Sequence, residues 1–182
     1  MKNVVEIIIR YRSFVGILCL IIILYLSEPS PRSVAVGFFM ILAGMFFRAW
    51  ASGYISKDNE LATKGPFSLT RNPLYFGNFV LGLGIAIAGN NLYSYVIFFV
   101  FYLLFFPFLM ILEHRRMKKK FGEKYREYAK KSHSFFPKIK KIRERDFNIS
   151  YYMQNREYRV LFFSIFVIGI LILKVLRNIR SH

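Results

Sequence analysis

Apolar runs alternate with polar segments along most of the chain. A membrane-spanning helix needs about 20 predominantly apolar residues, and the longer runs approach this length. In chain order the runs are Phe14–Leu26, Val34–Ile55, Leu74–Ala88, Leu92–Leu112 and Val160–Leu173. The last run holds only 14 residues, so it either spans the membrane or stays re-entrant or interfacial. The pattern therefore predicts an all-α, polytopic membrane helix bundle with four spanning helices and a fifth candidate.

Turn residues separate these runs. Pro29 and Pro31 follow the first run, and a helix cannot continue through two prolines. Gly89-Asn90-Asn91 divides the third run from the fourth. Asn72-Pro73 begins the third helix, because proline is tolerated in a first helical turn. Within that helix we expect neighbouring helices to approach closely at the glycines Gly77, Gly82 and Gly84.

The composition agrees with an integral membrane protein that has one basic face. The 182 residues are 55% hydrophobic, with a mean hydropathy of +0.35 and a formal net charge of +17. A soluble domain of this size is rarely so apolar, and a nucleic-acid-binding protein would not need the uncharged runs. We therefore expect the lipid bilayer as a partner, and no nucleic acid. The sole cysteine, Cys19, lies in an apolar run, so neither an intrachain disulfide nor a metal site is expected.

The basic residues predict the orientation of the bundle. They gather before the first run, between the second and third, and most densely after the fourth. If four helices cross, all three groups fall on one side, which the positive-inside rule makes cytoplasmic. A spanning fifth run would put Lys174, Arg177 and Arg180 on the other side, against that rule. The first run is interpreted as a retained helix, because no small-residue cleavage site follows it.

The segment Glu113–Lys131 is predicted to be a cytoplasmic, basic amphipathic helix that ends before Phe135-Phe136-Pro137. Its apolar residues recur at helical spacing on one side, at Met117, Phe121, Tyr125 and Tyr128. Such a helix would lie on an anionic membrane surface.

Three parts follow from this pattern: an N-terminal helix pair in residues 1–56, a core in 57–137, and a basic connector with a hydrophobic helix in 138–182. The hairpin of the third and fourth runs returns two polar elements to one face of the bilayer. Arg71 and Glu113 are the candidate chemical groups there. Arg71 also suits a simple membrane anchor, and Glu113 the start of a surface helix, where the helix dipole favours it. The sequence has neither a phosphate-binding loop nor a metal-spaced histidine pair.

Two motifs resemble a known family. GPFSLTRNPLYFG, in 65–77, resembles the Gly-Pro-Tyr…Arg-His-Pro-x-Tyr-x-Gly signature of isoprenylcysteine carboxyl methyltransferases and phospholipid methyltransferases. EHRRMKKKFGEKYREY…FFP, in 113–137, resembles their Glu-Glu-x-x-Leu-x-x-x-Phe-Gly-x-x-Tyr-x-x-Tyr…Pro element. The resemblance covers about Ser52–Pro137 and rests on both motifs at this separation. It implies an integral membrane methyltransferase that uses S-adenosyl-L-methionine, with its site facing the cytoplasm.

The resemblance also implies which residues form the site. Arg71 matches the first motif's arginine, and Glu113 matches an acidic residue of the substrate site; both are candidate catalytic residues. The methyl acceptor would be a hydrophobic or lipidated molecule that arrives from the bilayer. The cofactor positions carry over to Asn59, Glu60, Leu61, Ala62, Phe67, Asn72, Pro73, Leu74 and Tyr75, with Ser52 as a weaker match.

Three positions depart from the family pattern. Asn72 replaces a histidine, and it keeps a hydrogen-bond donor and acceptor but cannot titrate near neutral pH. His114 replaces the second glutamate. Leu109 stands where the carboxyl methyltransferases carry an arginine that contacts the substrate. A carboxylate acceptor thereby loses a partner, which favours a lipid or lipid-like acceptor over a prenylated cysteine.

Three other functions stay open at this point. The first alternative is an isoprenylcysteine carboxyl methyltransferase proper. The second is a relative of the membrane sterol reductases, which are similar over the same region and bind a nicotinamide cofactor there. The third is a non-catalytic membrane protein whose basic helix binds anionic lipid. Binding of S-adenosyl-L-methionine, of NADPH or of neither distinguishes these functions.

Overall fold

The computed structural model describes residues 2–56, 60–138 and 147–180, with only the backbone described in 2–9. Within these ranges the regular structure is helical, as predicted. The elements are α1 (Lys2–Leu26), α2 (Pro31–Ser52), the 3₁₀ helix η1 (Gly65–Ser68), α3 (Pro73–Gly89), α4 (Leu92–Lys131), α5 (Ile149–Gln154) and α6 (Tyr158–Arg180).

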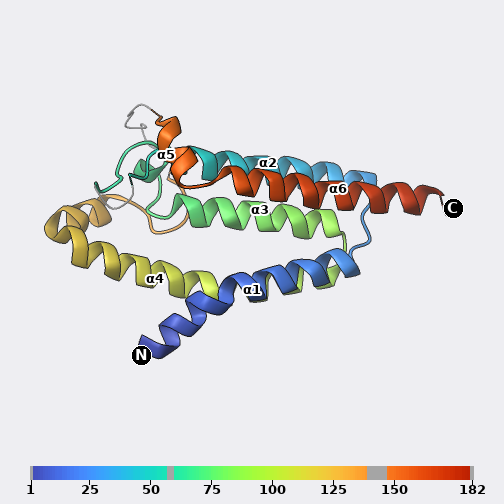
Figure 1. Ribbon diagram of the computed structural model, residues 1–182, viewed down its shortest axis with the longest axis horizontal. Coiled ribbons are helices and arrows are strands. Elements are labelled where there is room, and N and C mark those ends of the chain that lie inside the picture. Colours follow the sequence, from blue (N-terminus) through green and yellow to red (C-terminus); the bar gives the residue numbers. More distant parts are fainter. Residues whose placement is uncertain (1, 57–59, 139–146, 181–182) are drawn as a thin grey trace.

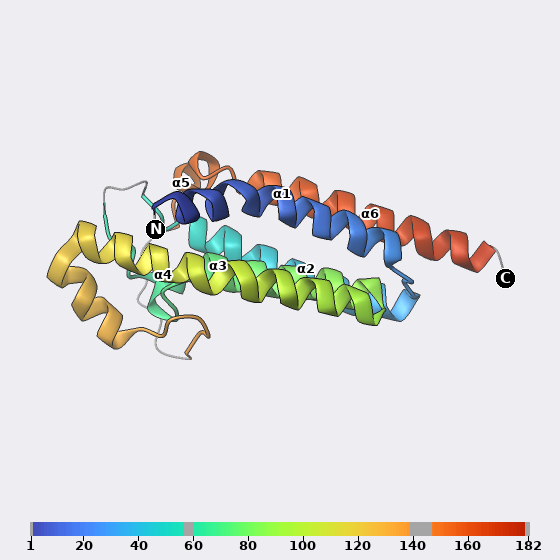
Figure 2. The ribbon, with the colours of Figure 1, turned by 90° about the horizontal axis from the view of Figure 1, so that it is seen from below.

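The long helices lie side by side (Figures 1 and 2). α1, α3 and α6 run in one direction, and α2 and the apolar part of α4 run in the other. One end of the bundle, called the site end here, gathers the loop between α2 and α3, the outer part of α4, and α5. The opposite end, called the far end, holds the two short interhelical turns and the end of α6.

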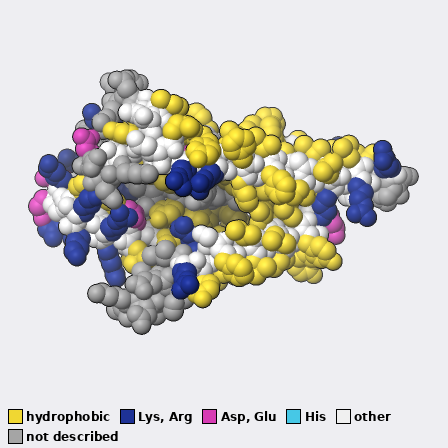
Figure 3. All heavy atoms as spheres, viewed as in Figure 1, with side chains coloured by type: hydrophobic (Ala, Val, Ile, Leu, Met, Phe, Trp, Pro, Cys, Tyr) yellow, Lys and Arg dark blue, Asp and Glu magenta, His cyan; other side chains and the backbone are white. Residues whose placement is uncertain are grey.

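Three of the described helices, α2, α4 and α6, are long and apolar enough to cross a membrane. α3 is apolar but has 17 residues. The short run in 160–173 belongs to α6, a helix of 23 residues, which has the length of a membrane span. An apolar band covers much of the surface in Figure 3, and Lys and Arg side chains gather beyond both of its ends. The all-α class is confirmed, while crossing by four or five helices stays a prediction.

Glycines bring α2 and α3 into backbone contact. Gly37 faces Gly84, and Gly44 faces Gly77, so both helices present glycine at a spacing of seven residues. A Cβ atom on Gly37 would lie 2.5 Å from the Gly84 carbonyl oxygen, which leaves no room for any side chain. The expected close approach at Gly77 and Gly84 is thus made against α2, whereas Gly82 faces the ring of Phe98 on α4.

Polar contacts hold the far end together. The Glu28 amide donates to the Gly89 carbonyl at 2.8 Å, which joins the turn after α1 to the end of α3. Lys174 of α6 donates to the carbonyls of Leu24 and Ser27 at 2.8 and 2.7 Å, where α1 has unsatisfied carbonyl groups. One of the three basic residues that oppose the positive-inside rule therefore has a structural role in this bundle.

We predict that Gly44→Ala destabilises the bundle, because the new methyl group would lie 2.6 Å from the Leu81 amide nitrogen and 2.7 Å from the Gly77 carbonyl oxygen. Backbone atoms cannot rotate away, so the overpacking should cost about 1–3 kcal/mol. Thermal unfolding of the purified protein in detergent measures the loss. Gly169→Ala on α6 is the control, since nothing lies within 4 Å of its Cβ position. Equal melting temperatures for the two variants would contradict the proposed backbone contact.

Candidate functional site

A glycine bends the outer part of α4 back over the site end. Gly122 has φ 55° and ψ −126°, a conformation that side chains strongly disfavour, and it interrupts the helix at this point. Before this point the basic segment from Glu113 continues the apolar helix without a break, so no new helix begins at Glu113; the position of this segment on a cytoplasmic membrane surface stays a prediction. The segment still ends at Lys131, as expected.

The chain that follows α4 pairs with the loop before α3. The Arg71 amide donates to the His133 carbonyl at 2.8 Å. The Asn72 side-chain amide donates to the Ser134 carbonyl at 2.7 Å, and the Tyr128 hydroxyl donates to the Phe67 carbonyl at 2.7 Å. These bonds join the two motifs that the sequence places far apart.

A pocket of about 310 Å³ lies between the joined motifs. Its volume is at the lower end of the roughly 300–1,000 Å³ range typical of small-molecule sites. Ten of the predicted site residues line it, from the loop after α2, the start of α3 and the end of the apolar part of α4. They are Glu60, Leu61, Ala62, Phe67, Arg71, Asn72, Pro73, Leu74, Tyr75 and Glu113.

Two predicted cofactor residues are not in this lining. Ser52 is fully buried, and its hydroxyl donates to the Ala49 carbonyl of its own helix at 2.8 Å. Asn59 lies outside the described residues. Leu109, which stands in place of the family arginine, is buried at 5% exposure and does not line the pocket.

Six further residues line the pocket and were not predicted as site residues: Ile55, Ser56, Met117, Phe121, Tyr125 and Tyr128. The last four form the apolar stripe that helical spacing identified. The stripe was assigned to the membrane surface, because its period shows which residues share a face but not what that face contacts. The bend at Gly122 turns Tyr125 and Tyr128 toward the pocket, where Tyr125 is 5% exposed.

The charge in the pocket centres on Arg71. No ion pair between Arg71 and Glu113 forms among the described residues; instead, Arg71 is hydrogen-bonded to Tyr125. Partial burial lowers the pKa of His114, and the charges of Arg71 and Lys118 lower it further. Both effects favour the neutral form of His114, whose Nδ1 lies 3.0 Å from the Tyr125 hydroxyl. Burial raises the pKa of Tyr125, so this hydroxyl keeps its proton and can donate to His114.

The family model for phospholipid methyltransferases matches residues 11–124. The match includes α1 to α3 and most of α4, and so extends over the helices that position the pocket. The chain belongs to the phospholipid methyltransferase family, a family of membrane methyltransferases.

Curated relatives carry different names. The chain is 32% identical over 112 residues to the cobalt-zinc-cadmium resistance protein CzcN of Cupriavidus metallidurans, covering 60% of this chain and 51% of the relative. It is 30% identical to the nickel-cobalt-cadmium resistance protein NccN of Alcaligenes xylosoxydans xylosoxydans, covering 63% and 54%. It is 31% identical to the protein-S-isoprenylcysteine O-methyltransferase of Schizosaccharomyces pombe, covering 55% and 42%.

The chain thus spans about half the length of the curated relatives it matches. No solved structure matches it. In the part of the chain that the structure describes, no group of three or more His, Cys, Asp or Glu side chains is placed to hold a metal ion.

We predict that Gly122→Ala releases the outer part of α4 from the pocket. Nothing lies within 4 Å of the Cβ position, so the cost is the backbone strain of φ 55°, about 1–3 kcal/mol. Hydrogen–deuterium exchange should become faster in 123–138 and stay unchanged in α2 and α3. The control is Lys119→Ala, an exposed helical position one turn earlier. The assigned bend is incorrect if both variants exchange at the parent rate.

Proposed function

We propose that this protein transfers the methyl group of S-adenosyl-L-methionine to a lipid or lipid-like acceptor in the membrane. The observation that carries the proposal is the single pocket shared by the two family motifs, which are about 40 residues apart in the sequence. The family and a relative named as a methyltransferase support the reaction class.

The pocket residues suit this cofactor. Aromatic side chains of Phe67, Tyr75 and Tyr128 offer faces to a cationic sulfonium and to an adenine ring. Arg71 can hold a carboxylate, and acidic groups at Glu60 and Glu113 are complementary to an ammonium group. A pocket with one guanidinium, two carboxylates and apolar walls therefore matches an amphoteric cofactor of this size.

When bound, S-adenosyl-L-methionine supplies an electrophilic methyl group on its sulfonium. The protein's work is then to align the acceptor nucleophile and to exclude water. Glu113 lies where the uncharged part of α4 ends, so it can orient an acceptor or take a proton from an amine or hydroxyl. Tyr125 and Tyr128, which follow the bend at Gly122, contribute to the pocket wall.

The two reactants should reach the site by different routes. The pocket is bounded by the polar loop at the site end, by the first turn of α3 and by the part of α4 from Glu113 onward, where the apolar part of that helix has ended. We infer that the cofactor enters from the cytoplasm and the acceptor enters laterally from the bilayer. A prenylated cysteine is the second candidate acceptor, because Leu109 offers its carboxylate no charged partner.

We predict that Ala62→Trp blocks cofactor binding. Ala62 is half-buried in the pocket wall, and an indole at this position would occupy much of its 310 Å³. Calorimetry with S-adenosylhomocysteine should show at least about a tenfold loss of affinity, equal to ~1.4 kcal/mol. Leu92→Trp is the control, because Leu92 is 73% exposed at the far end. Binding of NADPH instead, or of neither ligand by the parent protein, would refute the proposed function.

We predict that Glu113→Gln lowers methyl transfer by about 10²–10⁴-fold, as expected for losing a general base, with little change in cofactor affinity. Labelled cofactor is supplied with a total membrane lipid extract or with a farnesyl-cysteine analogue. The matched control is Glu123→Gln, since Glu123 is exposed on the same helix and pairs with exposed Arg126. If Glu113→Gln transfers the methyl group at the parent rate, Glu113 has no role in catalysis. Ester formation on the analogue alone would reverse the order of the two acceptors.

A further inference from the structure

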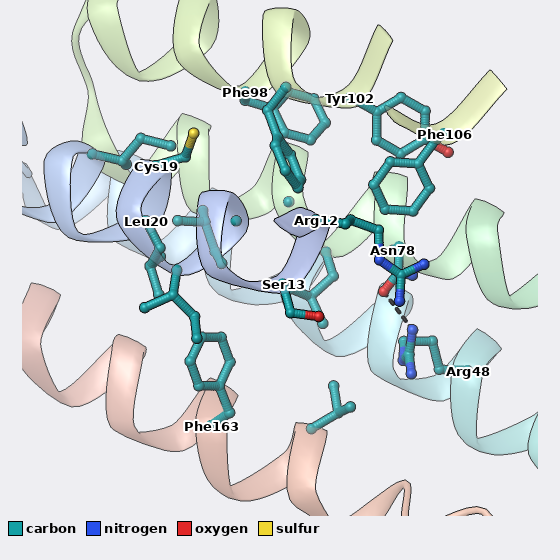
Figure 4. A pocket seen from close by; sticks show the side chains of 18 residues that line it. Arg12, Ser13, Cys19, Leu20, Arg48, Asn78, Phe98, Tyr102, Phe106 and Phe163 are labelled. Carbon is teal, nitrogen blue, oxygen red and sulfur yellow. Dashed lines mark hydrogen bonds between the residues drawn. The ribbon is translucent and has the colours of Figure 1, made fainter. Parts of the chain in front are cut away.

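A second cavity, of about 430 Å³, lies inside the apolar part of the bundle (Figure 4). Residues of α1, α2, α3, α4 and α6 line it, and most of them are apolar or aromatic. At about 30 Å³ for each water-sized group, it has room for roughly 14 such groups. That capacity accommodates most of one long hydrocarbon chain with a small head group, and it is too small for the two chains of a diacyl lipid.

Polar side chains gather at one end of this cavity. Arg48 donates to both carboxylate oxygens of Glu157, from Nη2 at 2.7 Å and from Nε at 3.0 Å. Its third contact is a hydrogen bond from Nη1 to Asn78 Oδ1. Glu157 is only 9% exposed, so the charge of Arg48 is neutralised within a buried, bidentate pair.

Arg12 adds a second guanidinium to the same end. Its side chain extends from α1 toward Asn78 and Arg48, which are hydrogen-bonded to each other (Figure 4). Among the described residues, no carboxylate forms an ion pair with Arg12, and Glu157 is already committed to Arg48. The polar end of the cavity therefore has one positive charge without an opposite charge, beside an apolar interior where such a charge is costly.

The polar end of the cavity points toward the site end, and its apolar part lies deeper in the bundle. A lipid in the leaflet nearest the site end would have its head group and its chain arranged in the same way. Arg48 lies one turn before the end of α2 at the site end, and Arg12 precedes the apolar run of α1. The apolar lining continues deeper into the bundle, along α1 to Ile23 and along α3 to Ile85. An amphiphile with its head at Arg12 would thus place its chain toward the middle of the bundle.

A wall separates this cavity from the cofactor pocket. The rings of Tyr75 and Phe106 pack edge to face with centroids 5.7 Å apart. The Tyr102 hydroxyl donates to the Tyr75 carbonyl at 3.0 Å. Tyr75 lines the cofactor pocket, whereas Phe106 and Tyr102 line the cavity. The two spaces are therefore distinct sites that share one aromatic partition.

We propose that the cavity binds a single-chain membrane amphiphile with one negatively charged head group, held by Arg12. The head group chemistry is a carboxylate or a phosphate ester, and the chain occupies the apolar lining. The site is separate from the proposed methyl transfer, so its test requires neither cofactor nor turnover.

The first experiment measures binding of radiolabelled hexadecanoic acid to the purified full chain in detergent. Arg12→Gln should weaken binding roughly tenfold or more, the size expected for losing one charge-assisted hydrogen bond. Arg12→Lys should restore part of it. Arg10→Gln is the matched control, because Arg10 is an exposed arginine of the same helix outside the lining. Melting temperatures of all variants should match the parent, which separates lost binding from lost folding.

The second experiment locates the ligand with the sole cysteine, because Cys19 lines the cavity. Saturating hexadecanoic acid should slow alkylation of Cys19 by N-ethylmaleimide, and hexadecanol at the same concentration should not. Single-chain lysophosphatidic acid in a third arm shows whether a phosphate head group is preferred. Equal affinity in Arg12→Gln, unchanged alkylation at saturation, or equal protection by hexadecanol would each overturn the proposal.

Discussion

Backbone contact between α2 and α3 is the constraint on which the rest of the bundle depends. In a membrane, lipid tails are as apolar as leucine, so helices associate through close packing rather than through the hydrophobic effect. The paired glycines allow this packing, and Gly77 also makes room for Arg48, whose Cγ would lie 2.7 Å from an added Cβ. Close approach therefore lets Arg48 reach Asn78 on α3 and Glu157 before α6. A single interface thus positions α3, the buried charge pair and the last helix.

A second constraint, the backbone conformation of one glycine, closes the site end outside the apolar band. Gly122 bends α4, and the chain beyond it pairs with the loop before α3 through Arg71 and Asn72. This closure explains why an asparagine is compatible with the position of the family's histidine. Asn72 uses its side-chain amide to hold the returning chain at Ser134, a contact that needs a donor but no titratable group. Its primary contribution in this structure is to the shape of the pocket.

Much of the helical fold and of the pocket could be predicted from the sequence. Apolar runs and turn residues mark the helices, and the two motifs identify the residues that form the pocket. The helices begin at Pro31 and Pro73 near the expected positions, and the two motifs do form one pocket. What could not be predicted are the partners of individual residues, which no local pattern specifies. The apolar stripe with Tyr125 faces the pocket, because the φ of Gly122 decides its direction. Ser52 is turned into its own helix. The 14-residue run extends into a longer α6, because Lys174 has carbonyl partners at the end of α1 that allow a charge within the helix.

Under the two proposals made above, the partition between the two spaces would separate a cofactor that enters from water from an amphiphile that enters from the membrane. Tyr75 has one side toward a pocket that contains Arg71 and Glu113, and its ring packs against Phe106, which faces an apolar cavity. Polar reactants need charged partners and water excluded around them, whereas a hydrocarbon chain needs only volume and apolar walls. Both requirements are met within one short helical bundle because α3 contributes its first turn to the pocket and its next turns to the cavity. The position of α3, fixed by its glycines against α2, therefore sets the geometry of both spaces at once.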